Sequence, residues 1–77
     1  MKYEVIRIKN GQYEDDPEYE TNNYHAAMDY CQKTMKQERN WAYSEMHKDE
    51  ALVIMKVTEK NGYFELDPKK VYEASEF

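Results

Sequence analysis

Residues 23–39, with the sequence NYHAAMDYCQKTMKQER, constrain the fold most because they show a clear helical period. The apolar side chains of this stretch recur at three- and four-residue steps and are Tyr24, Ala27, Met28, Cys31 and Met35. At about 100° per residue these side chains gather on one narrow face. Thr21, Asn22 and Asn23 offer three N-cap residues in succession. The stretch therefore predicts one amphipathic helix.

The segment before this helix predicts one strand and one loop. Residues 2–9 are rich in β-branched residues, carry apolar side chains on both faces, and end at the turn dipeptide Asn10-Gly11. Residues 12–20 hold five acids, no base and a proline. We expect a solvated loop there, with residues 12–14 returning as a hairpin arm.

The segment after the helix predicts a hairpin-rich sheet. Residues 41–47 alternate with period two, and residues 51–59, ALVIMKVTE, have the most buried character of the chain. Asn61-Gly62 is a strong hairpin signal and leads to a short strand over residues 63–66.

The end of the chain supports two interpretations. Asp67-Pro68 is typical of an N-cap followed by proline at the first helical position, which predicts a short helix over residues 69–75. Lys69 and Lys70 would oppose the dipole of that helix, so an extended tail is the alternative.

These elements define an α+β fold in two layers, with one long helix packed on a small antiparallel-rich sheet in the order β-α-β-β-β. The 77 residues form a single domain, residues 1–77, because a second domain would leave neither half enough apolar surface. Eight of the apolar residues are tyrosines, so the aliphatic core is thin. Small folds often gain stability by oligomerising, and we expect a homodimer.

Charge and cysteine content exclude several classes of protein. The net charge of −5 and the pI near 5.0 disfavour direct binding of nucleic acid or of an anionic membrane, and they permit a basic protein partner. One cysteine allows no intramolecular disulfide, and no apolar run resembles a signal peptide or approaches the roughly 20 residues of a membrane span. We expect a cytoplasmic protein.

Few side chains suggest catalysis. His25 and Asp29 lie four residues apart on the helix, and with His47 they could form a two-histidine, one-carboxylate metal set. An ordinary surface pair is the favoured interpretation of the first two. Cys31 lies on the apolar stripe, where burial raises the pKa of a thiol. The sequence has no glycine-rich phosphate loop and no nucleophile motif. We expect no enzyme, no cofactor and no metal.

Two surface features remain as candidate partner-binding sites. The first is an acidic run interleaved with two tyrosines, comprising Tyr13, Glu14, Asp15, Asp16, Glu18, Tyr19 and Glu20. The second is the pair Trp41 and Tyr43 on one face of a predicted strand. Carboxylates could steer the protein towards a basic partner while aromatic rings anchor the complex. A solubilising loop and a ring-lined core rim are the simpler interpretations.

The acidic, tyrosine- and methionine-containing chain without catalytic motifs is similar to many small accessory proteins of phages and other mobile elements, including inhibitors of host defence systems. That resemblance implies a non-enzymatic protein that blocks a larger, basic, nucleic-acid-handling protein. The alternative hypothesis is a homodimeric module that binds a small ligand or RNA.

Overall fold

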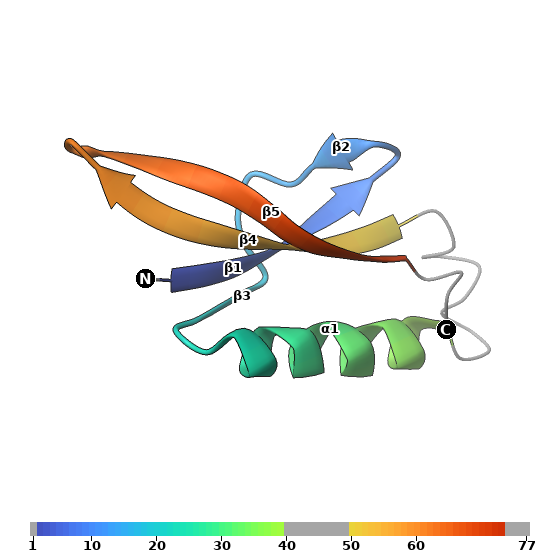
Figure 1. Cartoon of the computed structure of the whole chain (residues 1–77). Helices are drawn as coiled ribbons and strands as arrows, with labels where there is room; N and C mark the ends of the chain where they lie inside the picture. The colour runs from blue at the N-terminus through green and yellow to red at the C-terminus, as the bar shows by residue number, and fades with distance from the viewer. Residues whose placement is uncertain (1, 40–49, 74–77) are drawn as a thin grey trace.

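The structure is a computed structural model that describes residues 2–39 and 50–73. Within these ranges the elements are β1 (Lys2–Lys9), β2 (Gln12–Tyr13), β3 (Tyr19–Thr21), α1 (Tyr24–Arg39), β4 (Glu50–Lys60) and β5 (Tyr63–Glu73). The strands form one antiparallel sheet in the order β2-β1-β4-β5, and β3 also pairs with β1. Helix α1 lies across one face of this sheet (Figure 1). The predicted two-layer α+β fold is confirmed.

Helix α1 begins where the sequence predicts an N-cap. The side-chain oxygen Oδ1 of Asn23 accepts hydrogen bonds from the backbone N–H groups of His25 (2.9 Å) and Ala26 (3.3 Å). These bonds satisfy two of the donors that a helix leaves unpaired at its start. The hydroxyl of Thr21 in turn accepts a bond of 3.1 Å from the N–H of Asn23. Strand β3 is therefore joined to the helix by a defined turn.

The apolar stripe of α1 forms the main core together with one face of the sheet. Ala27, Cys31 and Met35 have no exposed surface, as predicted from their spacing. The sheet side chains of this core cluster are Val5, Leu52, Ile54 and Tyr72. Because side chains alternate along strands, these residues share the face that the helix covers.

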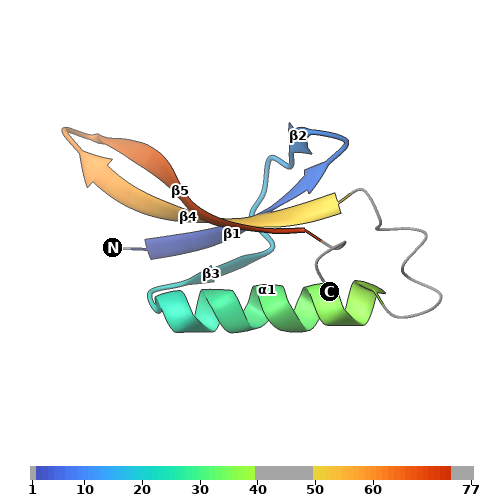
Figure 2. The same ribbon diagram turned by 45° about the vertical axis from the view of Figure 1, so that its right-hand side comes forward.

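The opposite face of the sheet is also apolar at its centre. Ile6, Val53 and Met55 form a second buried cluster with Ile8 at its margin. Strand β4 is consequently buried on both faces along residues 52–55. This explains its continuous apolar sequence, since a strand with one solvated face would alternate. In the described part of the chain, the helix covers only the first of these two faces (Figures 1 and 2).

Both hairpins turn at Asn-Gly dipeptides. Asn10 and Gly11 have φ values of 52° and 80°, and Asn61 and Gly62 have φ values of 51° and 86°. Positive φ at both central residues is the geometry of a type I′ turn, whose twist matches that of the flanking strands. The sequence therefore predicted both turns correctly.

The β4–β5 hairpin extends beyond the rest of the sheet. Pairing between β1 and β4 ends at Lys2 and Val57, so residues 58–65 form a ribbon of two strands. We call this ribbon the hairpin arm. Figures 1 and 2 show the hairpin arm projecting past the start of β1 and away from the helix. Its side chains are largely solvated, with Tyr63 61% exposed and Phe64 69% exposed.

Two predictions and one strand that was not predicted need comment at the level of secondary structure. The prediction of a helix over residues 69–75 is wrong, because residues 69–73 continue β5. Pairing with the long apolar strand β4 outweighs the local Asp67-Pro68 signal, and a register shift opposite Ile54 and Met55 accommodates the proline. Strand β3 was not predicted. The strand predicted over residues 41–47 lies outside the described residues.

Candidate docking site at the acidic loop

The acidic loop, residues 14–18, is an insertion in the pairing along β1. Val5 pairs with Tyr19 and Ile8 pairs with Tyr13, so five loop residues stand opposite only Ile6 and Arg7. Both ends of the loop are fixed by backbone hydrogen bonds. The N–H of Glu14 donates to the carbonyl of Arg7 (2.9 Å), and the N–H of Glu18 donates to that of Val5 (2.8 Å).

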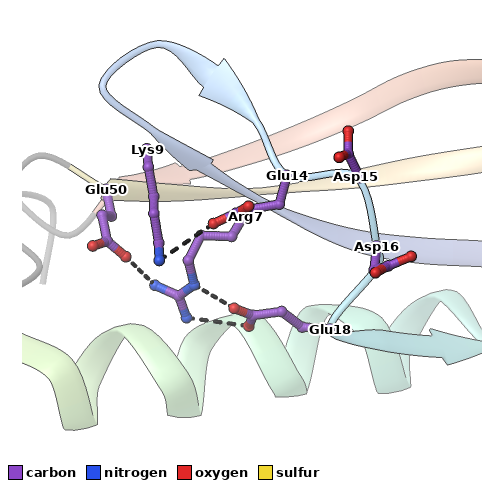
Figure 3. Close-up of a pocket in the computed structure, with 7 residues that line it drawn as sticks. All are labelled: Arg7, Lys9, Glu14, Asp15, Asp16, Glu18 and Glu50. Carbon is purple, nitrogen blue, oxygen red and sulfur yellow. Dashed lines mark hydrogen bonds and ion pairs between the residues drawn. The ribbon is translucent and has the colours of Figure 1, made fainter.

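Arg7 holds the end of this loop from inside the fold. Its side chain is only 8% exposed and lies on the helix-covered side of β1. The guanidinium donates two hydrogen bonds to Glu18, from Nε to Oε1 and from Nη2 to Oε2 (3.1 Å). Nη1 donates to Oε1 of Glu50 at 2.8 Å. Figure 3 shows Arg7 between these two carboxylates. The buried cation is thus matched by anions from two different segments.

The charge of Glu18 is stabilised by these contacts. Partial burial alone would raise the pKa of this carboxyl group, but hydrogen bonds from Arg7 and Tyr30 outweigh it and hold the pKa below its usual value. The Glu18 side chain keeps 26% of its surface exposed. Glu18 therefore serves chiefly as an internal counter-ion and is less available to a partner than its neighbours.

Tyr30 connects the acidic loop to α1. Its hydroxyl donates a hydrogen bond of 3.0 Å to Oε2 of Glu18. Its ring stacks on that of Tyr19, with centroids 4.7 Å apart and planes within 4° of parallel. Burial and the neighbouring Glu18 carboxylate both raise the pKa of the Tyr30 phenol. Tyr30, which lies away from the centre of the apolar stripe, thus has a structural role.

Asp15 and Asp16 form the exposed tip of the loop. Neither carboxylate makes an ion pair with any residue that the structure describes, and both point away from Arg7 (Figure 3). They line an open depression of about 460 Å³, whose other lining residues are Arg7, Lys9, Glu14, Glu18 and Glu50. Five carboxylates thus face two cations there, so the depression has an excess of negative charge.

The remaining predicted docking residues occupy several environments. Tyr13 is 54% exposed beside the loop. Glu14 pairs with Lys9 at 3.2 Å, and Glu20 lies 3.7 Å from Lys2 in a second surface ion pair. Trp41 and Tyr43 lie outside the described residues. The structure thus brings Tyr13, Glu14, Asp15 and Asp16 together beside β1. It assigns Glu18 and Tyr19 to internal contacts.

Sequence reasoning missed Arg7 and Glu50 as parts of this site. The available signal was the period of β1, which places Arg7 on the same face as Val5, where the predicted helix would bury a cation. A buried arginine requires acidic partners, and the acidic run provides one of them. Glu50 could not be predicted as the second because the register between β1 and β4 was unknown.

The described residues offer little for metal or thiol chemistry. Residues 2–39 and 50–73 contain no group of three His, Cys, Asp or Glu side chains able to hold a metal ion. His47, from the candidate metal set, lies outside these ranges. Burial, with a smaller effect from Glu18, raises the pKa of the Cys31 thiol to about 12. Such a thiol is a poor nucleophile at neutral pH, as its position on the apolar stripe indicated.

Comparisons with known proteins give no family assignment. The chain matches no protein-family model, and neither the curated proteins nor the solved structures contain a significant match to it. None of the described helical residues forms a segment with the length and apolar character needed to cross a membrane.

Proposed function

We propose that this chain is a small non-enzymatic binding protein whose acidic loop docks on a basic surface of a larger, nucleic-acid-handling protein and blocks it. An accessory inhibitor of a phage or other mobile element would act in this way. The observation that carries the proposal is the loop tip, where Asp15 and Asp16 are exposed and have no ion-pair partner among the described residues.

The anchoring of the loop supports this role. Backbone bonds at Glu14 and Glu18, together with the Arg7 contacts, hold the tip in a defined position before any partner arrives. A preorganised loop loses less conformational entropy on binding than a flexible one. Tyr13, which is exposed beside the loop, supplies amphipathic contact area of the kind that anchors interfaces.

Long-range electrostatics gives this proposal a kinetic signature. Exposed carboxylates mainly accelerate the encounter with a basic partner. Salt reduces this effect, because at 0.1 M ionic strength it screens the attraction between charges more than roughly 10 Å apart. Neutralising the tip should therefore slow association and weaken its salt dependence, with little change in dissociation.

The test begins with affinity capture of the tagged protein from a bacterial lysate at low and at high salt, followed by mass spectrometry. Association kinetics of the retained protein are then measured with the double variant Asp15→Asn, Asp16→Asn. We expect association to slow by roughly two- to tenfold at low salt, within the range of electrostatic steering.

The matched control is the double variant Asp29→Asn, Glu59→Gln, which changes the net charge equally at two positions that do not line the depression. It should keep nearly wild-type kinetics. Equal slowing in both double variants would show that net charge alone acts, and would contradict docking at the loop. If the retained protein still binds nucleic acid when it is in the complex, the blocking role is contradicted.

A further inference from the structure

Strand β5 forms one edge of the sheet, and its outer side pairs with no described element. Its order in the sheet is last, next to β4 alone. The strand is 11 residues long, and every residue from Tyr63 to Val71 is exposed. Long exposed edges present unpaired backbone N–H and C=O groups and are templates for pairing with another strand.

The charges along β5 are arranged so that the strand complements itself. Glu65 and Asp67 occupy its first half, and Lys69 and Lys70 occupy its second half, with Glu73 at the end. Within one chain, Glu65 and Asp67 form surface ion pairs with Lys60 (3.2 Å) and Lys69 (2.7 Å). In an antiparallel pair of identical strands, the first half of each lies beside the second half of the other. Acidic residues would therefore lie beside basic residues on both sides of a two-fold axis.

The faces of β5 restrict the register of such a pair. Phe64 and Val71 pair with Glu59 and Val53 of β4, so both side chains lie on the face away from the helix. Glu65 and Lys70 pair with Thr58 and Ile54, on the helix-covered face. Residues directly opposite each other in a sheet must point to the same side. The register with Phe64 opposite Val71 meets this requirement, and it also places Glu65 opposite Lys70.

The backbone of β5 fits the same register. Proline cannot donate to a ladder, so Pro68 belongs where the backbone nitrogen points to the outer edge. Because backbone N–H and C=O groups of alternate residues point to the same side of a strand, those of Phe64 point outward as at Pro68. The extra residue at the register shift makes those of Val71 point outward as well. The N–H and C=O groups of Phe64 and Val71 therefore point outward and could form a hydrogen-bonded pair across the edge.

Charge balance favours a second copy as the occupant. Residues 58–70 carry three acids and three bases, whereas the whole chain has a net charge of −5. The acids are Glu59, Glu65 and Asp67, and the bases are Lys60, Lys69 and Lys70. Two copies can thus meet at this edge without the like-charge repulsion that the acidic loop would cause. The acidic loop lies at the other side of the sheet, beyond β1 (Figure 1).

We propose that β5 pairs antiparallel with β5 of a second copy of this chain, with Phe64 opposite Val71 and Glu65 opposite Lys70 of that copy. The two sheets then become one, and the apolar faces that carry Phe64, Leu66 and Val71 become continuous. Pro68 and the register shift lie near the two-fold axis and divide the new ladder into two short symmetric segments. The pairing uses both β5 edges and closes as a dimer. It does not depend on the proposed blocking function.

The test is sedimentation equilibrium of the purified full chain with charge-swapped variants. The wild type should reach twice the chain mass of 9.4 kDa as concentration rises. Glu65→Lys and Lys70→Glu each place like charges opposite one another at two symmetric positions. Each should raise the dissociation constant of the dimer roughly tenfold or more. The double variant Glu65→Lys, Lys70→Glu restores opposite charges and should recover the wild-type constant.

Glu59→Lys is the matched control, because Glu59 lies one strand inward in the same arm. It should dimerise like the wild type, and circular dichroism should show all variants folded. A wild type that stays monomeric at every concentration would overturn the proposal. So would a dimer that both single variants leave intact, because it would use another surface.

Disulfide trapping tests the register itself. In the double variant Glu65→Cys, Lys70→Cys, the two Cα atoms of each opposed pair would lie about 4.5 Å apart, within the range that a disulfide spans. Oxidation should give a covalent dimer. The variant Glu65→Cys, Val71→Cys places the thiols on opposite faces and should give much less. Equal trapping in both variants would contradict this register.

Discussion

Along the outer edge of β1, charged and aromatic side chains are bound to one another: Arg7 joins Glu18 and Glu50, and Tyr30 joins Glu18. Along β5 the side chains from residue 63 to residue 71 are exposed on both faces. The two edges have similar polar composition, yet β5 joins the helix-covered core only near its end, at Tyr72, and its hairpin arm projects away from the helix (Figures 1 and 2). The difference indicates that position over the second layer, more than residue type, decides which polar side chains are used for folding and which stay available for binding.

The same comparison separates the body of the sheet from the hairpin arm. Two-stranded ribbons are marginally stable alone in water, whereas three or more strands with an apolar face support independent folding. Residues 50–57 of β4 have neighbouring strands on both sides, whereas in the described part of the chain residues 58–65 pair only with each other. The following variants test this division, starting with the largest expected effect.

Leu52→Ala and Leu66→Ala compare the same truncation in the two regions. Leu52 is fully buried beneath α1, while Leu66 is 49% exposed at the base of the arm. We expect Leu52→Ala to lower the free energy of unfolding by about 3 kcal/mol, the usual cost of a core cavity. Leu66→Ala should cost less than about 1 kcal/mol in dilute protein. Urea unfolding measures both values, and equal costs would contradict the division.

Arg7→Ala and Lys9→Ala compare two cations on the same face of β1. Removing Arg7 leaves the Glu18 and Glu50 carboxylates without their shared cation. This should cost about 3 kcal/mol, at the low end for breaking a buried pair because both carboxylates are partly solvated. Lys9 forms a surface pair with Glu14, and its removal should cost about 0.5 kcal/mol or less. If the two variants unfold at the same urea concentration, Arg7 does not hold this edge.

Asn23→Ala tests whether the turn from β3 into α1 is fixed locally. Loss of the two cap hydrogen bonds should lower the free energy of unfolding by about 1 kcal/mol. Asn22→Ala is the matched control, because this exposed neighbour does not cap the helix, and it should change stability by less than about 0.5 kcal/mol. A larger loss from Asn22→Ala would place the cap one residue earlier.

The pH dependence of stability tests the role of Glu18. Its pKa is lower in the folded protein than in the unfolded chain, where a glutamate titrates near 4.3. The resulting stabilisation is present above that value and is lost as the pH falls through the folded pKa. Urea midpoints between pH 7 and pH 3 should fall more steeply for the wild type than for Glu18→Gln. Parallel profiles would show that Glu18 is not the internal counter-ion.

Local chemistry predicted much of this fold. The stripe containing Cys31 and Met35 defined the buried face of the helix, Asn23 defined its start, and the two Asn-Gly dipeptides defined the hairpins. Each of these signals lies within a few neighbouring residues. They were sufficient to predict an α+β fold with the helix on one side of the sheet.

Features that depend on pairing between distant segments were not predictable in the same way. Three residues of β3 carry too little pattern to indicate a strand, and they are ordered by pairing with β1. Asp67-Pro68 has the local signature of a helix start, but β4 recruits that segment into the sheet. In the candidate site, the acidic run was visible in the sequence. The division between Glu18, which is bound internally, and the exposed Asp15 and Asp16 depends on where Arg7 lies.

Amide hydrogen exchange followed by NMR at low and high protein concentration tests the contrast between the two edges most directly. The N–H of Glu18, bonded to the carbonyl of Val5, should exchange slowly at both concentrations. The outward N–H of Phe64 should exchange rapidly in dilute protein and slow down as concentration rises. Rapid exchange at Glu18 would contradict a β1 edge closed by Arg7. Exchange at Phe64 that is slow in dilute protein, or independent of concentration, would contradict a β5 edge open to a second copy.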